Sequence, residues 1–333
     1  MNDLLKKLSD REREALRKKE QPEWTNPMLT KLSHEIFSDK NWIYERKLDG
    51  ERILIFKKGN KVSLKSRNKK ELNETYPEIV ESIKDQGSEN FIIDGEIVAF
   101  DGKITSFSKL QTRMHLKDPK EIKESKTRVY FYAFDIIYFE DYDLTKLGLT
   151  HRKAILKEAL KFNDPLRFTP HRNKNGEKYH KEACEKGWEG LIAKKADSEY
   201  VHQRSPNWLK LKCVNQQEFV IGGYTDPEGE RIGFGALLLG FYENGALKYA
   251  GKVGAGYDDK TLEDLHQKLS GIEKKDPEFA PNEDLPSKKV HWVTPKYVAE
   301  IGFTEWTDSN KLRHPRYLGL RRSKKPQEVI KEN

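Results

Sequence analysis

A tight acidic turn constrains the fold of this chain more than any other sequence feature. Asp49-Gly50 joins residues 43–47 to the apolar strand at residues 53–56, and the centre of the stretch reads K-x-D-G-x-R. Asp-Gly is a strong turn signal because glycine accepts a positive φ. A turn between two strands can hold the Lys47 amine and the Arg52 guanidinium on one wall of a pocket. A plain β-hairpin with solvated charges would show the same letters, so the motif alone establishes no function.

The first two thirds of the chain predict an α+β domain built on antiparallel sheets. Residues 61–67 alternate with period two after a hairpin loop at 57–60, and residues 91–100 and 128–139 are apolar, strand-like runs. Helical patterns lie near 76–86, 150–162 and 177–186, and strand character returns at 189–195 and 208–213. Mixed elements of this kind are typical of sheets covered by helices.

The pattern of expected elements changes after residue 214. Short strands are expected at 218–224, 234–242, 246–253 and 290–307, with Asn244-Gly245 joining the second to the third. One helix at about 258–270 interrupts them, capped by Asp258 or Asp259, with Leu262, Leu265 and Leu269 facing inward. Short strands with one inserted helix predict a small Greek-key barrel of the OB type. We therefore expect a peripheral charged helix over 1–21, an α+β domain over 22–214 and an OB-fold domain over 215–333.

Composition favours a soluble, intracellular protein with a polyanionic partner. The chain has 333 residues, 35% of them charged, and a mean hydropathy of −0.87, with no stretch that resembles a membrane span or a signal peptide. Its formal net charge of +8 suits phosphate-rich partners, although an unrelated basic enzyme would show the same balance.

Several common sites are excluded by counting residues. Cys184 and Cys213 are too few for a disulfide framework or a Cys-rich zinc site. The nine histidines show no H-E-x-x-H pattern. The pairs Gly102-Lys103 and Gly251-Lys252 are followed by Ile and Val, so any nucleotide is bound without a P-loop.

Six clusters of charged or aromatic residues nevertheless follow one another in a recognisable order. They are Lys47-Leu48-Asp49-Gly50-Glu51-Arg52, Ser66-Arg67, Asp94-Gly95-Glu96, Phe134-Asp135, Glu189-Gly190-Leu191-Ile192-Ala193-Lys194 and Trp208-Leu209-Lys210-Leu211-Lys212. This series resembles the signature of the covalent nucleotidyltransferases, which comprise ATP-dependent DNA ligases, RNA ligases and mRNA capping enzymes. Residues 222–256 and 303–321 further resemble the ligase domain of bacterial end-joining DNA ligase D. The resemblance covers about residues 22–324.

The resemblance implies that residues 22–214 are the adenylation (nucleotidyltransferase) domain and that Lys47 is the nucleophile that takes AMP from ATP. An amine must be neutral to attack phosphorus, and the pKa of a lysine falls near other cations or on burial. Lys210 and Lys212, two residues apart on a strand, point the same way and could lower the pKa of Lys47 while holding phosphates. In isolation the pair would be interpreted as a charged outer strand face.

The resemblance assigns the other ligands of the nucleotide and metal. Glu96 and Glu189 would lie near the ribose and a divalent cation, Mg²⁺ or Mn²⁺. Phe134 would stack on adenine, or else be an ordinary core residue. Glu45 would accept a hydrogen bond from adenine N6, which favours ATP over GTP. The remaining cations expected to contact ribose or phosphate are Arg52, Arg67, Lys194 and Arg204, with Arg67 reaching the 5′-phosphate at a nick; each arginine could instead be a surface charge.

The C-terminal motif departs from the family pattern. Family members typically end in R-x-D-K, whereas this chain has Arg321-Arg322-Ser323-Lys324. Arg321 and Lys324 would orient the leaving pyrophosphate, and Ser323 puts the efficiency of that first step in doubt. DNA ligase D commonly carries polymerase and phosphoesterase modules, and neither is found in these residues.

The function implied is that of an ATP-dependent DNA ligase, which seals 5′-phosphate/3′-hydroxyl breaks through lysyl-AMP and DNA-adenylate intermediates. It would serve DNA repair, recombination or non-homologous end joining, as a monomer in the cytoplasm, associated with the nucleoid if prokaryotic. Its partners would be nicked or broken duplex DNA, with Ku or other end-joining factors as candidates and no membrane. An RNA ligase, a capping-type enzyme and an inactive DNA-end-binding clamp are the alternatives. A NAD-dependent ligase is disfavoured, because two cysteines cannot form its four-cysteine zinc module.

Overall fold

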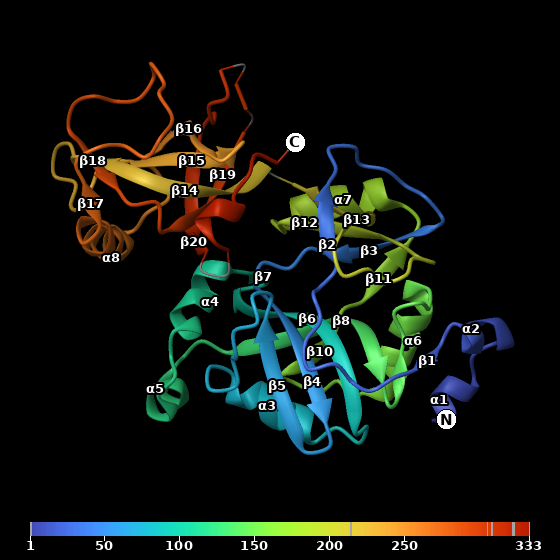
Figure 1. Cartoon of the computed structure of the whole chain (residues 1–333). Helices are drawn as coiled ribbons and strands as arrows, with labels where there is room; N and C mark the ends of the chain where they lie inside the picture. Colours follow the sequence, from blue (N-terminus) through green and yellow to red (C-terminus); the bar gives the residue numbers. More distant parts are fainter. Residues whose placement is uncertain (1, 214, 305, 308, 322–323, 333) are drawn as a thin grey trace. The chain divides into compact units, whose positions relative to one another are not determined.

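The computed structural model describes residues 2–213, 215–304, 306–307, 309–321 and 324–332 (Figure 1). The chain divides into two compact units, Met1–Cys213 and Val214–Asn333. Each unit has its own hydrophobic core, and each is described below by itself.

Two sheets form the framework of the first unit. The larger sheet has the order β1-β9-β8-β6-β4-β5, with β10 beside β8 and β7 beside β6, and the smaller sheet has the order β11-β3-β12-β13-β2. Among the described strands of this unit, β10 with β8 and β13 with β2 pair in parallel and the other pairs are antiparallel. The strands are β1 (Arg17–Lys18), β2 (Leu29–Leu32), β3 (Trp42–Arg46), β4 (Glu51–Lys58), β5 (Lys61–Ser66), β6 (Asn90–Asp101), β7 (Ile104–Thr105), β8 (Val129–Phe139), β9 (Tyr142–Asp143), β10 (Leu166–Phe168), β11 (His171–Asn173), β12 (Gly190–Lys195) and β13 (Arg204–Lys212).

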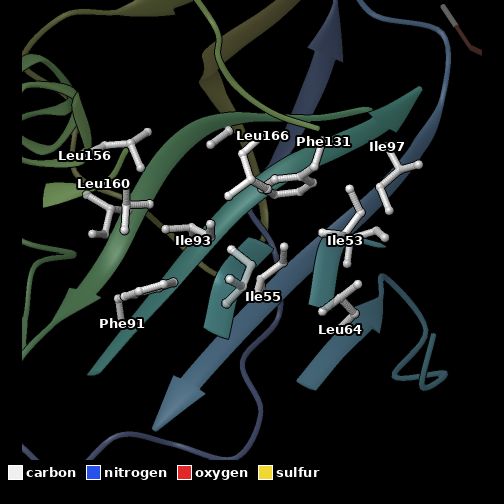
Figure 2. Packing of buried hydrophobic residues seen from close by; sticks show 14 of the residues in the cluster. Ile53, Ile55, Leu64, Phe91, Ile93, Ile97, Phe131, Leu156, Leu160 and Leu166 are labelled. Carbon is white, nitrogen blue, oxygen red and sulfur yellow. The ribbon is translucent and has the colours of Figure 1, made fainter. Parts of the chain in front are cut away.

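Alternation along the strands creates separate cores on the two faces of the larger sheet. On β4, Ile53 and Ile55 join one core, whereas Leu54 and Phe56 join another that lies between the two sheets. Figure 2 shows the first core, in which Ile53, Ile55 and other strand residues meet Leu156 and Leu160. The larger sheet is therefore buried on both faces.

Helices cover the outer faces of both sheets. Helices α3, α4 and α6 contribute apolar side chains to the outer core of the larger sheet, and α7 packs on the outer face of the smaller one. The helices of this unit are α1 (Asp3–Lys6), α2 (Asp10–Glu14), α3 (Pro77–Lys84), α4 (Phe107–Met114), α5 (Pro119–Glu124), α6 (Leu149–Ala159) and α7 (Gly176–Glu185).

The Asp49-Gly50 turn links the two sheets and does not close a hairpin. Strand β3 belongs to the smaller sheet and β4 to the larger, so the chain crosses between the sheets at this turn. Glycine is required at position 50 because a Cβ there would lie 2.1 Å from the Ile97 carbonyl oxygen. The expected reason, a positive φ, is wrong: Gly50 lies outside the left-handed region.

Two predicted hairpins are confirmed. Strands β4 and β5 pair from Lys58 opposite Lys61, and Gly59 in their turn has φ +56°. Strands β15 (Leu237–Glu243) and β16 (Ala246–Val253) are joined by Asn244-Gly245, both residues with positive φ, as a tight hairpin requires.

The second unit is one seven-stranded sheet that shares a hydrophobic core with helix α8. Its sheet has the order β16-β15-β14-β18-β17, with β19 pairing with both β14 and β20. Helix α8 begins after Asp258, whose side chain accepts a hydrogen bond from the Thr261 amide, and it buries Leu262, Leu265 and Leu269 as expected. The remaining elements are β14 (Asn215–Thr225), α8 (Asp259–Ser270), β17 (Glu273–Lys274), β18 (Val290–Val293), β19 (Val298–Phe303), β20 (Arg316–Arg321) and the 3₁₀ helix η1 (Pro326–Glu328).

The N-terminal segment differs from its prediction as one peripheral helix. It forms the short helices α1 and α2 and then strand β1, which pairs with β9. Leu5 is fully buried in the outer core, so this segment is integrated into the first unit. Within the described ranges, no helix is both long enough and apolar enough to cross a membrane.

Candidate active site

The residues singled out in the sequence share one side of their strands. On β3, Ile43 packs in the core between the sheets and Tyr44 packs with α7 on the outer face of the smaller sheet, so the same alternation puts Glu45 on the inner side. On β13, Trp208 is in the inner core, which places Lys210 and Lys212 on the inner side as well. The remaining residues that alternation places there are Arg52 on β4, Glu96 on β6, Phe134 on β8 and Lys194 on β12.

Lys47 lies immediately after β3 and contacts Glu189. Its Nζ is 2.5 Å from Glu189 Oε1, and the two side chains are only 19% and 7% exposed. Burial lowers the pKa of Lys47, but Glu189, Asp49 and Glu96 together outweigh burial and raise the pKa above its usual value. The expected net lowering of this pKa is not found in this structure, because carboxylates dominate the field at the amine.

Backbone hydrogen bonds fix the loop that carries Lys47. The Lys47 amide donates to the Gly190 carbonyl at 2.9 Å, which ties the loop to the start of β12. The Asp49 amide donates to Thr105 Oγ1, and Asp49 Oδ2 accepts from the Phe107 amide at the start of α4. Helix α4, which the sequence pattern did not predict, thus helps to hold the nucleophile's loop.

Arg52 is held by a buried carboxylate. Its Nε and Nη2 each lie 2.6 Å from an oxygen of Asp94, and Nη2 also donates to the Met28 carbonyl. Burial lowers the pKa of Arg52, but Asp94 outweighs burial and raises it. The guanidinium stacks 4.7 Å from the centre of the Phe134 ring, so Asp94 orients Arg52 toward that ring.

Glu45 is fully buried between two lysines. Its Oε1 lies 2.5 Å from Lys153 Nζ and its Oε2 lies 2.6 Å from Lys194 Nζ. Burial raises the pKa of Glu45, but the two ammonium groups outweigh burial and lower it, so the carboxylate stays ionised. Each carboxylate oxygen has a second lone pair with which to accept a further donor.

Lys153, on α6, is a site residue that sequence analysis missed. Its Nζ donates to Glu45 Oε1 and to the carbonyls of Phe134 and Thr169, so its three donors have three acceptors. In the sequence, Arg152 and Lys153 lie three and four residues after Leu149, at positions that a helix places on the same face as Leu149 and Leu156. Both are buried, and Arg152 forms a two-point ion pair with Asp135.

Phe134, Trp208 and Lys194 surround the Glu45 carboxylate. The two rings meet edge to face with centroids 6.0 Å apart. Lys194 Nζ lies 4.2 Å from the centre of the Phe134 ring and 4.1 Å from that of Trp208. Burial, which outweighs the attraction of Glu45, lowers the pKa of Lys194 to about 8.

Three buried polar atoms around Glu45 and Phe134 lack a hydrogen-bond partner among the described residues. They are Thr169 Oγ1, His171 Nδ1 and Trp208 Nε1. The Thr169 carbonyl accepts from Lys153, His171 lies opposite Glu45 in the β11–β3 register, and Trp208 packs on Phe134. Buried polar groups are normally paired, so this cluster fits a polar, planar ligand such as a nucleotide base.

Glu96 and Glu189 are the carboxylates expected to hold a divalent cation. Glu189 contacts the Lys47 amine, and the charge of Glu96 also raises the pKa of that amine. Carboxylate oxygens, completed by water and phosphate oxygens, are the ligands that Mg²⁺ or Mn²⁺ takes.

The structure does not bring all predicted residues to this side of the two sheets. Arg67 follows β5 and is half-buried, whereas Arg204 is exposed and donates to the Thr30 carbonyl. Arg321 and Lys324 belong to the second unit, where they pair with Glu300 and Glu218. Ser323 lies outside the described residues.

Two family models match most of the chain. The model of the ATP dependent DNA ligase domain matches residues 27–212, and that of the ATP dependent DNA ligase C terminal region matches residues 230–324. The multifunctional non-homologous end joining protein LigD of Pseudomonas aeruginosa is 33% identical over 320 residues, covering 93% of this chain and 37% of that protein. A DNA ligase of Sulfurisphaera tokodaii is 33% identical over 280 residues, covering 78% of this chain and 46% of that protein.

A solved structure shares the fold. Mycobacterial DNA ligase D complexed with ATP and MES superposes with a TM-score of 0.67 at 31% identity, covering 92% of this chain and 98% of that one. The chain spans less than half the length of the two curated relatives above.

Proposed function

This chain belongs to the ATP-dependent DNA ligase family, and on that premise we propose that it seals 5′-phosphate/3′-hydroxyl breaks in duplex DNA with ATP. The reaction passes through AMP bound to Lys47 and then through AMP bound to the DNA 5′-phosphate. The observation that carries the proposal is the Lys47 amine, buried against Glu189 on a loop tied to both sheets.

In the first step the Lys47 amine attacks the α-phosphorus of ATP. An N–P bond forms, the bond to pyrophosphate breaks, and the amine loses its proton. A divalent cation held by Glu96 and Glu189 would neutralise charge on the phosphates and the leaving group. Carboxylates engaged in this way attract the Lys47 ammonium less, which favours the neutral, nucleophilic amine.

The surroundings of Glu45 supply recognition of adenine. Glu45 accepts from the exocyclic N6 amino group, whereas guanine would present O6, a second acceptor, and be repelled. We assign Phe134 to stacking on the base. The residues that we assign to ribose and phosphate are Arg52, Lys194, Lys210 and Lys212, while Arg67 would contact the 5′-phosphate at the break.

In the second step AMP moves from Lys47 to the 5′-phosphate of the break. In the third step the 3′-hydroxyl attacks that phosphate, which joins the strand and releases AMP. The net charge of +8 favours binding of duplex DNA through its phosphates. Arg321 and Lys324 act earlier, on the pyrophosphate of ATP.

The names of the LigD relatives support a role in end joining and repair, with Ku or a similar end-binding protein as a partner.

A sealing assay tests the proposal. The protein is incubated with ATP, Mg²⁺ and a nicked duplex that carries a labelled 5′-phosphate, beside the same nick in RNA and beside GTP or NAD as cofactor. Sealing of DNA with ATP, its loss in Lys47→Ala and its retention in Lys31→Ala, an exposed lysine on β2, are expected.

Each failure has a distinct meaning. Sealing confined to RNA would identify an RNA ligase, and GMP transfer would identify a capping-type enzyme. Binding of DNA ends without any AMP transfer would identify an inactive clamp.

A further inference from the structure

One cluster of potential ligands lies apart from the groups assigned above. His180 and Cys184 stand one turn apart on α7, and Cys213 directly follows β13. The two cysteines form a disulfide with their Cα atoms 5.3 Å apart, and the His nitrogen and both sulfurs lie within 4.8 Å of one another. Counting cysteines alone indicated no site, because the histidine that completes it is identified only by the fold.

The hydrogen bond of the His180 ring leaves one ring nitrogen able to act as a ligand. Its Nε2 lies 3.2 Å from the Lys212 carbonyl oxygen, which can only accept, so Nε2 carries the hydrogen and donates. Nδ1 then bears the lone pair; Cys184 Sγ lies beside the ring, 3.7 Å from Nδ1 and 3.8 Å from Nε2. Metal-bound histidines commonly donate their other ring N–H to a backbone carbonyl in this way.

The backbone around the cluster is fixed on both sides. The spacing of His180 and Cys184 puts them on one face of α7, whose packing against β12 buries Tyr179 and Ala183. The Cys213 amide donates to the Glu189 carbonyl at 3.0 Å. All three side chains are half-buried, so they remain reachable by solvent.

We propose that His180, Cys184 and Cys213 form a Zn²⁺ site when the disulfide is reduced. Reduction by a phosphine breaks the S–S bond; each sulfur takes a proton from water, and the phosphine becomes its oxide. On binding, each thiol releases its proton to solvent and forms an S–Zn bond, and His180 Nδ1 adds a third bond. Water completes the tetrahedral set that zinc prefers.

The donor chemistry separates this site from Glu96 and Glu189. Thiolate and imidazole ligands select Zn²⁺ and similar soft ions, whereas carboxylates and phosphates select Mg²⁺ or Mn²⁺. Zn–S bonds of about 2.3 Å place two sulfurs roughly 3.8 Å apart. The two sulfurs, bonded to each other in the disulfide, therefore move apart when the reduced site takes up the metal.

The position of the site gives it a consequence for the chain. Cys213 comes directly after Lys212, so either the disulfide or the metal ties the end of β13 to α7. Zinc and oxidation compete for the same two sulfurs. The inference needs no catalytic role for β13 and stands whether or not the chain seals DNA.

Cobalt titration of the full chain tests the inference. Co²⁺ replaces Zn²⁺ in such sites, and its bonds to thiolates give a near-ultraviolet charge-transfer band that carboxylate ligands do not give. Phosphine-reduced protein should develop this band with one equivalent of Co²⁺ and lose it when Zn²⁺ is added. The unreduced protein should show no band.

Variants assign the ligands. Cys213→Ser should abolish the band, and His180→Ala should weaken Co²⁺ binding by more than the 10–100-fold that loss of an outer-sphere partner typically costs. His34→Ala, which changes an exposed histidine, should leave the band unchanged. Absence of the band in reduced wild type, or its persistence in Cys213→Ser, would overturn the proposal.

Alkylation gives a second readout on the unmodified sequence, in case a variant fails to fold. Zn²⁺ should slow the reaction of both thiols in reduced wild type with iodoacetamide. Equal alkylation rates with and without Zn²⁺ would also contradict the site.

Discussion

Glu45 remains charged in a place where an isolated carboxylate would be neutral. Its two oxygens contact Lys153 and Lys194, and these ion pairs keep its pKa below the usual value despite complete burial. A carboxylate held by two ammonium groups has a fixed orientation, which is what discrimination between an amino group and a carbonyl on a purine requires.

Replacing Lys153 with methionine should relax the choice between ATP and GTP. The loss of one charge-assisted hydrogen bond to Glu45, typically about 1.5–3 kcal/mol, predicts a fall in selectivity of about tenfold to a hundredfold. The measurement is the ratio of self-adenylation to self-guanylation rates. Lys157→Met, which changes an exposed lysine on the same helix, is the matched control.

A double-mutant cycle with Glu45→Gln completes this test. Because Lys153 acts through Glu45, the two substitutions should be strongly non-additive in their effect on the ratio. Additive losses would show that Lys153 supports the fold without positioning Glu45.

Lys47 should lose its proton more readily as the divalent cation binds. Glu189 raises the pKa of Lys47, so an ion that engages Glu189 and Glu96 removes that attraction and favours the neutral amine. The apparent pKa in the pH profile of adenylation should therefore fall as free Mg²⁺ rises, with ATP kept fully complexed. A profile that stays at the same pH at every Mg²⁺ concentration would contradict this coupling.

Among individual residues, the sequence predicted Lys47 and the carboxylates of the motifs, but it did not predict the lysine that contacts Glu45. Lys47, Glu45 and Glu189 follow from ordered motifs, and the structure places Lys47 against Glu189. Lys153 could not be predicted, because it lies 108 residues from Glu45 and no local spacing marks a contact of that range. The direction of the Lys47 pKa shift was wrong for a related reason, since it depends on which charges the fold brings closest.

Among the elements, the loop between β3 and β4 depends most on a single residue. A Cβ at position 50 would meet the Ile97 carbonyl oxygen at 2.1 Å and Val98 Cγ1 at 2.8 Å. Neither neighbour can retreat without moving β6, which carries Glu96. The loop would move instead, and Lys47 with it.

Gly50→Ala should therefore reduce adenylation by about a hundredfold, the cost of displacing a reacting group by about 1 Å. The rate of AMP transfer to the protein is the measurement, with circular dichroism as the check on folding. Gly87→Ala is the control, because a Cβ there meets nothing within 4 Å. Equal effects of the two substitutions would refute the steric argument.

Predictions of elements succeeded where periodicity was strong. Strands β5, β6 and β8, the hairpin at Asn244-Gly245 and helix α8 all follow from alternation, turn residues or caps. Helices α4 and α5 were missed because helices of eight and six residues are marginal on propensity alone and depend on tertiary packing. The segment at 1–21 was misread because Leu5 is anchored in the first unit's core, which local charge density does not show.

For the whole molecule, the predicted fold class is confirmed. The match to mycobacterial DNA ligase D supports an α+β nucleotidyltransferase domain followed by an OB-fold domain. Fold class could be predicted because six motifs keep their order along the chain.

Removing Arg321 and Lys324 together should impair the use of ATP more than the sealing of DNA that already carries the 5′-adenylate. Both cations belong to the second unit, and the role proposed for them ends when pyrophosphate leaves. Loss of charge stabilisation of this kind predicts a decrease of about a hundredfold or more in adenylation by ATP. The double alanine variant is assayed on both substrates.

Lys260→Ala with Lys288→Ala is the charge-matched control, because both lysines are exposed in the same unit. If the double alanine variant of Arg321 and Lys324 loses as much activity on pre-adenylated DNA as it loses with ATP, the two residues act in DNA binding or in folding instead.

The central claim is that Lys47 carries AMP, and intact mass measurement tests it most directly. Incubation with ATP and Mg²⁺ should add one AMP to the chain, and peptide mapping should place it on Lys47 through a bond stable in alkali and broken in acid. Lys47→Ala should add none. An adduct on another residue, or undiminished labelling of Lys47→Ala, would contradict the account.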